Sequence, residues 1–209
     1  GPLAARWLVD ASGQAAVVGR HLGTRRVLAR HRKVAHFAHM TGVWRNPGDR
    51  EGFPTVVMTD EGWFWIIPVD ESRTSVGLVI DQAAARAAGE PPRRMLAWAI
   101  GRCPVMAARC ADAEPTGQGG GMADFSYRCR PYAGPGHVLV GDAALFVDPV
   151  FSTGVCLGMV SAVHVAEMLA GVLRDGDDPE KARRRYVAFV DGSTRIFFRL
   201  IDHFYRPAF

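Results

Sequence analysis

Residues 137–158 read HVLVGDAALFVDPVFSTGVCLG, and the interpretation of the whole chain starts from them. Their apolar beginning predicts a short buried strand that ends at Asp142. A loop with Pro149 follows, and a long apolar helix begins at Thr153-Gly154. The first N–H groups of a helix have no partner within it and carry the positive end of its dipole. We therefore expect an anion or an electron-rich group to bind where this helix begins.

Small residues recur at every fourth position of the expected helix. This spacing places them on one helix face, which can press closely on a sheet or a cofactor. They are Gly154, Gly158, Ala162, Ala166 and Ala170. Asp142, at the end of the strand, is placed to accept hydrogen bonds from a ribose or ribityl hydroxyl. An ordinary strand–loop–helix unit explains the spacing equally well, because a Gly-Asp pair after a strand is a weak motif.

Two segments resemble the flavin-binding motifs of the FAD-dependent aromatic hydroxylase and halogenase superfamily. Residues 141–144 (GDAA), with Asp148-Pro149 further on, resemble the second flavin-binding motif of that superfamily. Residues 10–13 (DASG), which follow an apolar stretch, resemble the Asp-x-x-Gly segment that precedes it. The resemblance therefore links two distant parts of the chain to one cofactor.

Two narrower patterns are typical of flavin-dependent halogenases. Residues 63–68 (WFWIIP) fit the pattern W-x-W-x-I-P, and residues 146–154 (FVDPVFSTG) fit F-x-x-P-x-x-S-x-G. The resemblance runs from Leu8 to about Tyr205. It is closest to the halogenases that act on phenols and on carrier-bound substrates in natural-product and antibiotic biosynthesis.

This resemblance implies a fold class and a chemistry. The fold is α/β (α+β), with the carboxyl-terminal part of a Rossmann-like FAD domain, an antiparallel substrate-side sheet and C-terminal helices. The activity is that of a FADH2-dependent halogenase. It uses reduced FAD, oxygen and chloride or bromide to halogenate an electron-rich phenolic or pyrrole-like precursor. A separate flavin reductase supplies the reduced FAD, and the aromatic substrate is free or tethered to a carrier protein.

The resemblance also implies site residues. The expected cofactor-binding residues are Gly13, Asp142, Pro149, Gly154 and Val155. The expected halide-binding residues are Ser152, Thr153 and Gly154, through backbone N–H groups. The residues expected on the substrate side or its tunnel are Trp63, Trp65, Phe146 and Phe151. In this family the tryptophan motif is thought to keep the substrate away from the activated flavin, so that a small oxidant has to travel.

Two features of the family are missing from this sequence. The Gly-x-Gly-x-x-Gly fingerprint should lie upstream of Asp10, and residues 117–121 do not replace it, because no buried strand precedes them and no helix follows. The lysine that halogenases use near the substrate also belongs upstream, since Lys33 and Lys181 match no such motif. The catalytic residue is therefore unknown, and we expect the chain to be an inactive part of a longer enzyme.

Two alternative functions stay open. An aromatic hydroxylase or another FAD-dependent oxidoreductase shares the flavin motifs but uses the flavin directly on its substrate. A non-catalytic truncated fragment has no turnover and serves as a binding partner. Halogenated product separates the first alternative from a halogenase, and flavin titration separates the second.

Composition argues against several other classes of protein. The chain has 25 Lys and Arg against 21 Asp and Glu, but these basic residues are scattered, so a nucleic-acid partner is not expected. The four cysteines lack zinc-site spacing; we expect no metal, and buried thiols in a reducing cytoplasm, with Cys156 in the core. Residues 155–173 are interrupted by Ser161, His164 and Glu167, which favours a buried helix of a soluble protein over a membrane span.

The order of segments predicts four parts. Residues 1–32 and 133–178 are expected in the FAD domain, residues 33–132 in the substrate-side sheet with its helices, and residues 179–209 in a C-terminal helix. Residues 114–121 are expected as a flexible loop, either a mobile lid or an unstructured connection. Residues 122–130 are expected to follow as a strand. Pro91-Pro92 is expected to open a helix, and Asp178 to cap the last helix with Pro179 at its first position.

Period-two alternation organises the expected sheet. Residues 55–60, 62–69 and 74–80 are expected as successive antiparallel strands. Alternation places Trp63 and Trp65 on one face of the sheet together with Ile67. It places Phe64 and Ile66 on the other face. His36 and His39 fall on opposite faces of a strand, so a metal pair is not expected there.

Overall fold

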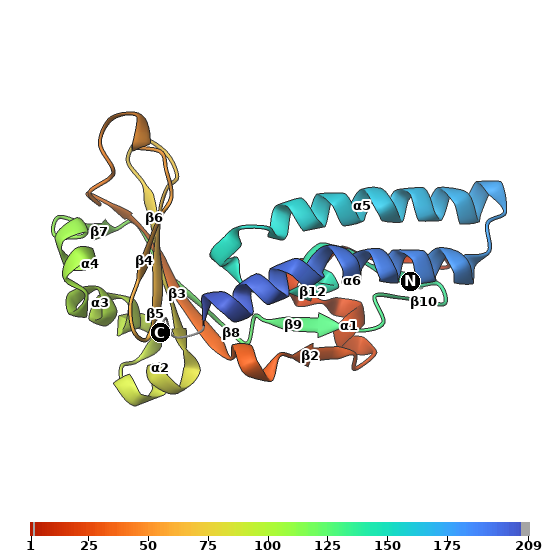
Figure 1. Ribbon diagram of the computed structural model, residues 1–209, viewed down its shortest axis with the longest axis horizontal. Helices are drawn as coiled ribbons and strands as arrows, with labels where there is room; N and C mark the ends of the chain where they lie inside the picture. The colour runs from red at the N-terminus through yellow and green to blue at the C-terminus, as the bar shows by residue number, and fades with distance from the viewer. Residues whose placement is uncertain (2, 206–209) are drawn as a thin grey trace. The chain divides into compact units, whose positions relative to one another are not determined.

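The computed structural model describes residue 1 and residues 3–205, and it divides the chain into two compact units (Figure 1). Residues 1–28 and 125–209 form the two-segment unit, and residues 29–124 form the inserted unit. The expected boundaries lay at other positions. Residues 122–130 had been expected as one strand, but this part of the chain passes from one unit to the other.

Asp124, the last residue of the inserted unit, adopts a left-handed backbone conformation, with a φ of 51°. Before it, β8 (Gly120–Ala123) pairs within the inserted unit, and after it β9 (Tyr127–Cys129) pairs within the two-segment unit. The prediction of a single strand was therefore wrong.

The inserted unit contains a six-stranded sheet with the order β4-β5-β6-β3-β7, in which β8 also pairs with β3. The remaining strands are β3 (Lys33–Thr41), β4 (Thr55–Met58), β5 (Gly62–Pro68), β6 (Thr74–Asp81) and β7 (Glu114–Pro115). All of these pairings are antiparallel, which confirms the predicted order of successive strands. Both β7 and β8 lie on one edge of β3, so part of the expected flexible loop is strand.

Helices cover one face of this sheet. They are α2 (Gln82–Ala88), α3 (Pro92–Arg102) and α4 (Pro104–Arg109). The short 3₁₀ turn η2 (Ala29–His31) precedes β3, and η3 (Gly48–Arg50) lies between β3 and β4. Both α3 and α4 begin with proline, which is tolerated in a first helical turn. Leu96 and Met106 pack with Phe64 and Ile66 in one buried cluster. The predicted alternation along β5 is thereby confirmed.

The two-segment unit contains two three-stranded sheets. In the first, β1 (Leu8–Asp10) pairs in parallel with β11 (His137–Leu139), which pairs antiparallel with β10 (Ala133–Gly134). In the second, β9 lies between β12 (Leu145–Phe146) and β2 (Arg25–Val27). The turn η1 (Gly13–Ala15) and helix α1 (Val17–His21) follow β1. The 3₁₀ turns η4 (Gly141–Ala143) and η5 (Pro149–Phe151) follow β11 and β12.

Two long helices complete this unit. The first, α5 (Gly154–Ala170), continues into the π-helical turn η6 (Gly171–Asp175), and the second is α6 (Pro179–Phe204). The Asp178 carboxylate accepts the N–H of Glu180 at 2.9 Å, and Pro179 occupies the first helical position. This start of α6 agrees with the predicted cap and proline.

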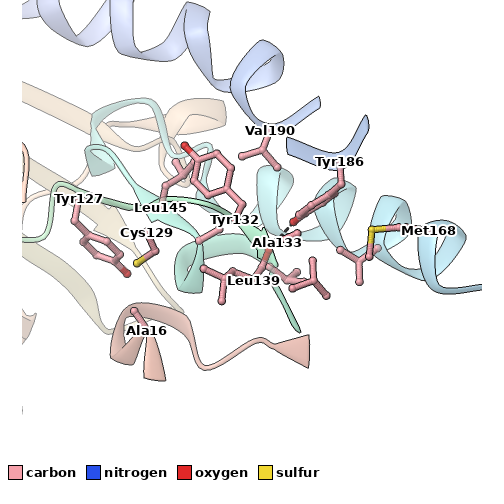
Figure 2. Packing of buried hydrophobic residues seen from close by; sticks show 14 of the residues in the cluster. Ala16, Tyr127, Cys129, Tyr132, Ala133, Leu139, Leu145, Met168, Tyr186 and Val190 are labelled. Carbon is pink, nitrogen blue, oxygen red and sulfur yellow. Dashed lines mark hydrogen bonds between the residues drawn. The ribbon is translucent and has the colours of Figure 1, made fainter. Parts of the chain in front are cut away.

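The core of the two-segment unit is rich in tyrosine (Figure 2). Tyr127 and Tyr132 are fully buried, and Tyr186 from α6 is 3% exposed. The hydroxyl of Tyr186 donates to the carbonyl of Leu139 at 2.6 Å, the dashed line in Figure 2, and so ties α6 to the end of β11. The buried face of α6 is formed by Ala182, Tyr186, Val190, Thr194 and Ile201.

The apolar helix α5 is mostly exposed, so the prediction of a buried helix was wrong. Val155 is 76% exposed, Met159 67% and Val163 57%, and Cys156 is also exposed rather than packed in the core. Residues 154–175 have the length of a membrane span, and an 18-residue window within them has a mean hydropathy of 1.8, with 22% of that window buried. The exposed side chains form an apolar surface, which proteins normally cover.

Candidate functional site

The candidate site begins where two parallel strands end side by side. In the β1–β11 register Asp10 lies opposite Leu139, and the N–H of Val140 donates to the carbonyl of Asp10 at 2.9 Å. The segments that follow, η1 and η4, pack on one another. Ligands of α/β proteins bind at the carboxyl edge of parallel strands. Residues 10–13 and 141–144, expected to serve one cofactor, therefore meet at the edge where such a cofactor binds.

Asp10 holds its own turn together. Its carboxylate accepts the N–H of Ser12 at 3.0 Å and the N–H of Val18 at 2.7 Å. Burial acts to raise the pKa of Asp10, but hydrogen bonds from Ser12 and Val18 outweigh it and leave the pKa below its ordinary value. The turn places Gly13 in a left-handed conformation with a φ of 60°. Gly13 is thus needed for the backbone path beside η4.

Asp142 is the carboxylate that remains for a ligand at this edge. It is half-buried, and this burial raises its pKa, although a hydrogen bond from the side chain of Gln14 acts in the opposite direction. Its carbonyl oxygen accepts the hydroxyl of Tyr127 at 2.5 Å. The backbone of Asp142 is therefore fixed, while its carboxylate meets the neutral donor Gln14 and, among the described residues, has no basic partner that would lower its pKa.

The start of α5 lies next to Asp142. A Cβ atom added at Gly154 would lie 3.7 Å from Asp142 Oδ1 and 3.8 Å from Phe146 Cε2. No side chain caps this helix, because Thr153 forms no capping hydrogen bond, and Ser152 before it adopts a left-handed φ of 51°. The first N–H groups of α5 therefore keep the capacity to bind a ligand.

Glycines allow α5 to approach the strand end. A Cβ atom added at Gly141 would lie 3.2 Å from the Cα of Gly158, and Gly141 has a φ of 56°. Ser161 accepts the N–H of Gly141 at 3.1 Å and donates to the carbonyl of Gly158 at 2.9 Å. Ala162 and Ala166 are exposed, so the predicted small-residue face was only half right. The buried face instead continues through Ser161, Val165 and Met168.

A small cavity joins these groups with α6. Its lining includes Asp142, Phe146, Thr153 and Gly154, together with Tyr186, Phe189, Val190, Ser193 and Thr194 of α6. Its volume of about 40 Å³ accommodates a small ion or a water molecule but not a flavin ring. Five predicted site residues of the two-segment unit do not line this cavity: Gly13, Pro149, Phe151, Ser152 and Val155.

Asp148 and Tyr205 belong to the site but were not assigned by sequence reasoning. Asp148 is 5% exposed, and its Oδ1 accepts the N–H of Val150 at 3.0 Å at the start of η5. Its Oδ2 accepts the hydroxyl of Tyr205 at 2.8 Å. The rings of Phe151 and Phe204 also meet edge to face, with centroids 6.0 Å apart. The sequence pair Asp148-Pro149 is typical of a capped turn. No sequence pattern indicates that Tyr205 donates to Asp148.

The tryptophan motif lies in the inserted unit, on the sheet face opposite the helices. Trp63 is 2% exposed, and its ring centroid lies 5.9 Å from that of Trp65. Trp65 donates from Nε1 to Ser75 Oγ at 3.0 Å. A Cβ atom at Gly77 would lie 2.1 Å from the Trp65 ring, so the ring rests directly on this glycine. Both tryptophans are thus held rigidly within one aromatic face.

The fold and the site together define an α/β protein in which the carboxyl edge of a parallel strand pair meets the uncapped start of a long helix, as in dinucleotide-binding proteins. The particular family follows from comparison. Residues 2–206 match the model of the tryptophan halogenase family, and the chain belongs to that family.

Individual relatives agree with this assignment. One relative is the 1H-pyrrole-2-carbonyl-[peptidyl-carrier protein] brominase of Pseudoalteromonas luteoviolacea. The chain is 32% identical to it over 202 residues, and the match covers 95% of this chain and 50% of the relative. It is 33% identical over 200 residues to sulochrin halogenase of Aspergillus terreus, covering 90% and 36%. The solved structure of the flavin-dependent brominase Bmp2 has a TM-score of 0.90 at 33% identity, covering 96% and 51%. The chain thus spans half or less of these curated relatives.

Proposed function

We propose that the protein takes part in flavin-dependent halogenation of an electron-rich aromatic compound. The observation that carries the proposal is the placement of Asp142 and Gly154 together, at the carboxyl edge of two parallel strands and at an uncapped helix start. A ribityl or ribose hydroxyl suits the carboxylate, and a halide suits the N–H groups of the helix. Family membership supports the same assignment.

These residues suit part of a site for FAD. Asp142 has a half-buried carboxylate without a basic partner in the part of the chain that the structure describes, and the glycines at positions 141, 154 and 158 leave backbone uncovered. Bound reduced FAD would supply the two electrons that reduce oxygen to the peroxide level, and that oxygen would be the oxidant that takes two electrons from the halide. Within this chain, Asp142 holds a flavin hydroxyl, and Thr153 and Gly154 hold the halide through N–H groups, with Ser152 beside them. Gly13, Pro149 and Val155 border the flavin.

The small cavity gives the halide a water-poor place. It is large enough for an ion, and apolar side chains such as Leu145 and Leu157 form much of its wall. Preformed N–H donors in such surroundings stabilise negative charge more strongly than in water. Phe146 and Phe151 then shape the route of the oxidant, and Trp63 and Trp65 screen the substrate.

Uncovered surfaces on the two-segment unit fit a site that needs more protein than this chain contains. Leu8 and Val9 of β1 are 55% and 42% exposed, and the apolar side chains of α5 are exposed as well. In the curated relatives the matched region is half of the protein or less. We infer that further sequence covers β1 and α5 and supplies the glycine-rich fingerprint, and that the chain by itself is inactive. Cytoplasmic location and reduction by a separate flavin reductase belong to this proposal.

The substrate class is proposed from the relatives. One is named for a pyrrole attached to a carrier protein and another for sulochrin. We propose a phenolic or pyrrole-like precursor, free or tethered to a carrier protein. The test incubates the natural full-length protein with reduced FAD, oxygen, bromide and such precursors, and follows the products by mass spectrometry. Brominated product supports the proposal. Oxygenated product without bromine identifies an aromatic hydroxylase instead, and flavin titration without binding identifies a non-catalytic protein.

A further inference from the structure

The inserted unit contains a cleft that the proposed halogenation does not use. Its floor is the helix-covered face of β3, and its walls are the first turns of α3 and residues 117–121. The volume is about 530 Å³, within the range of roughly 300–1,000 Å³ typical of small-molecule pockets. The lining residues all belong to the inserted unit, and none of them is acidic.

A buried imidazole lies in the floor of this cleft. His36 is 7% exposed, and its recorded polar neighbour is the carbonyl of Pro92 at the start of α3. An imidazole has two ring nitrogens, so one nitrogen remains for another partner. A buried polar atom is normally hydrogen-bonded to protein, water or ligand. His36 is therefore suited to contact a molecule in the cleft.

Gly121 uncovers this imidazole. In the β3–β8 register Gly121 lies opposite His36, and a Cβ atom added to it would lie 3.4 Å from His36 Nδ1. Packing explains the neighbouring glycines differently, because a Cβ at Gly120 would overlap the Phe37 ring at 2.6 Å and one at Gly119 would lie 2.9 Å from the Phe37 carbonyl. A Cβ atom at Gly121 would also lie 3.4 Å from the Ala35 carbonyl, without the overlap found at Gly119 and Gly120, so the glycine leaves the Nδ1 edge of the imidazole uncovered.

Positive charge lies at the rim of the cleft. Arg93 is exposed in the first turn of α3 and lines the cleft, and its guanidinium has no ion-pair partner among the described residues. The adjacent Arg94 is paired with Glu90 at 3.6 Å and does not line the cleft. No acidic residue occupies the first turn of α3, where the dipole favours negative charge. An anion bound in the cleft would pair with Arg93 and interact favourably with the first turn of α3.

The rest of the floor is apolar. Ala38 and Met40 of β3 and Leu96 of α3 are each less than 10% exposed and line the cleft beside His36. One arginine and one imidazole suit a single negative charge better than a phosphate group, for which several cations usually converge. We propose that this cleft binds a small carboxylic acid with an apolar body, whose carboxylate meets Arg93 and His36 while the body rests on Leu96 and Met40.

Calorimetric titration with sodium benzoate tests the proposal on the natural full-length protein. Acetate has the charge without the body, benzyl alcohol has the body without the charge, and inorganic phosphate has a larger charge. We expect benzoate to bind at least tenfold more tightly than any of these three. Equal binding of benzyl alcohol or tighter binding of phosphate would overturn the assigned ligand class, and no benzoate binding at millimolar concentration would overturn the site.

Variants locate the binding in the cleft. Arg93→Ala is expected to weaken benzoate binding about tenfold, whereas the matched variant Arg94→Ala leaves it unchanged. Gly121→Val is expected to abolish binding by covering His36. Ala97→Phe, from an exposed position of α3 that lines the cleft, fills the same space and serves if Gly121→Val does not fold. The proposal is wrong if Arg93→Ala and Arg94→Ala behave alike, or if neither filling variant weakens binding.

Discussion

The hydroxyl of Tyr205 donates a hydrogen bond of 2.8 Å to Asp148 Oδ2, which ties the end of α6 to the loop before α5. The other carboxylate oxygen of Asp148 accepts the N–H of Val150 at 3.0 Å. Because Asp148 is buried, its carboxylate depends on such donors. The position of Pro149 and the residues up to Gly154 thus depends on a residue 57 positions further along the chain.

Removing this hydroxyl should loosen the loop. Tyr205→Phe is expected to lower the free energy of unfolding by about 1–2 kcal/mol, because the buried carboxylate of Asp148 loses a donor. Urea denaturation measures the change. His203→Ala, at an exposed position of the same helix end, is the control and should leave stability unchanged. Equal stability of Tyr205→Phe and the natural protein would show that the hydrogen bond does not hold the loop.

A larger side chain at the start of α5 should block the proposed halide position. The Cβ of Gly154→Val would already be in van der Waals contact with Asp142 Oδ1 at 3.7 Å and Phe146 Cε2 at 3.8 Å, and its methyl groups would take up further space beside the first N–H groups of α5. We expect kcat/KM for bromide to fall at least tenfold in the full-length protein, with Gly154→Ala intermediate. Met159→Ala, on the exposed face of α5, is the control. Unchanged bromination by Gly154→Val would remove the halide assignment.

The ionised carboxylate of Asp142 is expected to lower the free energy of unfolding at neutral pH. Burial raises the pKa of Asp142 in the folded state above the ordinary value of 3.8, which applies to the unfolded state. At a pH between the ordinary pKa and the raised pKa, the folded state therefore binds more protons than the unfolded state. Stability from this group is therefore greatest at acidic pH and falls as pH rises through that window. Asp142→Asn should be more stable than the natural protein at neutral pH and equally stable below the ordinary pKa.

Urea denaturation at several pH values measures the difference in stability between Asp142→Asn and the natural protein. Flavin titration measures how much FAD affinity the substitution removes. Asp142→Asn should bind FAD at least tenfold more weakly, because a charged acceptor for a ribityl hydroxyl is lost. Asp178→Asn, which changes the cap of α6, is the control for flavin binding. A variant that is less stable at neutral pH would contradict the direction of the pKa shift, and unchanged flavin affinity would contradict the role of Asp142.

The packing of the Trp65 ring against Gly77 can be tested by adding one methyl group at Gly77. Gly77→Ala would place its Cβ within 2.4 Å of three ring atoms, so the ring or the strand has to move. We expect a loss of about 1–3 kcal/mol in the free energy of unfolding. Gly52→Ala, where a Cβ meets nothing within 4 Å, is the control. If Gly77→Ala were as stable as the control, Trp65 would not be held rigidly.

Much of the local structure was predictable because it depends on neighbouring residues. Prolines at helix starts, the cap at Asp178 and the period-two pattern of β5 each act within a few positions, and the structure agrees with all of them. The strand, acidic residue, loop and helix of residues 137–158 also appear in the predicted order. The family assignment, made from short motifs, is confirmed by the match to residues 2–206.

The site was only partly predictable because its parts are distant in sequence. Spacing within α5 indicated a face of small residues, but the partner that selects the buried face is η4, so Ala162 and Ala166 are exposed. The assigned roles in binding flavin, halide and substrate remain predictions. The pairing of Gly121 with His36 was not foreseen, because residues 114–121 carry no strand signal of their own.

By itself the sequence determined much of the order and type of the local elements and the family to which the chain belongs, since propensities, caps and motifs act over short distances. Only the tertiary structure decided the surroundings of the two carboxylates at the strand ends. Asp10 satisfies its own turn, whereas Asp142 meets the open start of α5, because β1 and β11 pair in parallel and the glycines at 141 and 158 allow contact. Such contacts depend on chain segments brought together by burial, which no local pattern records.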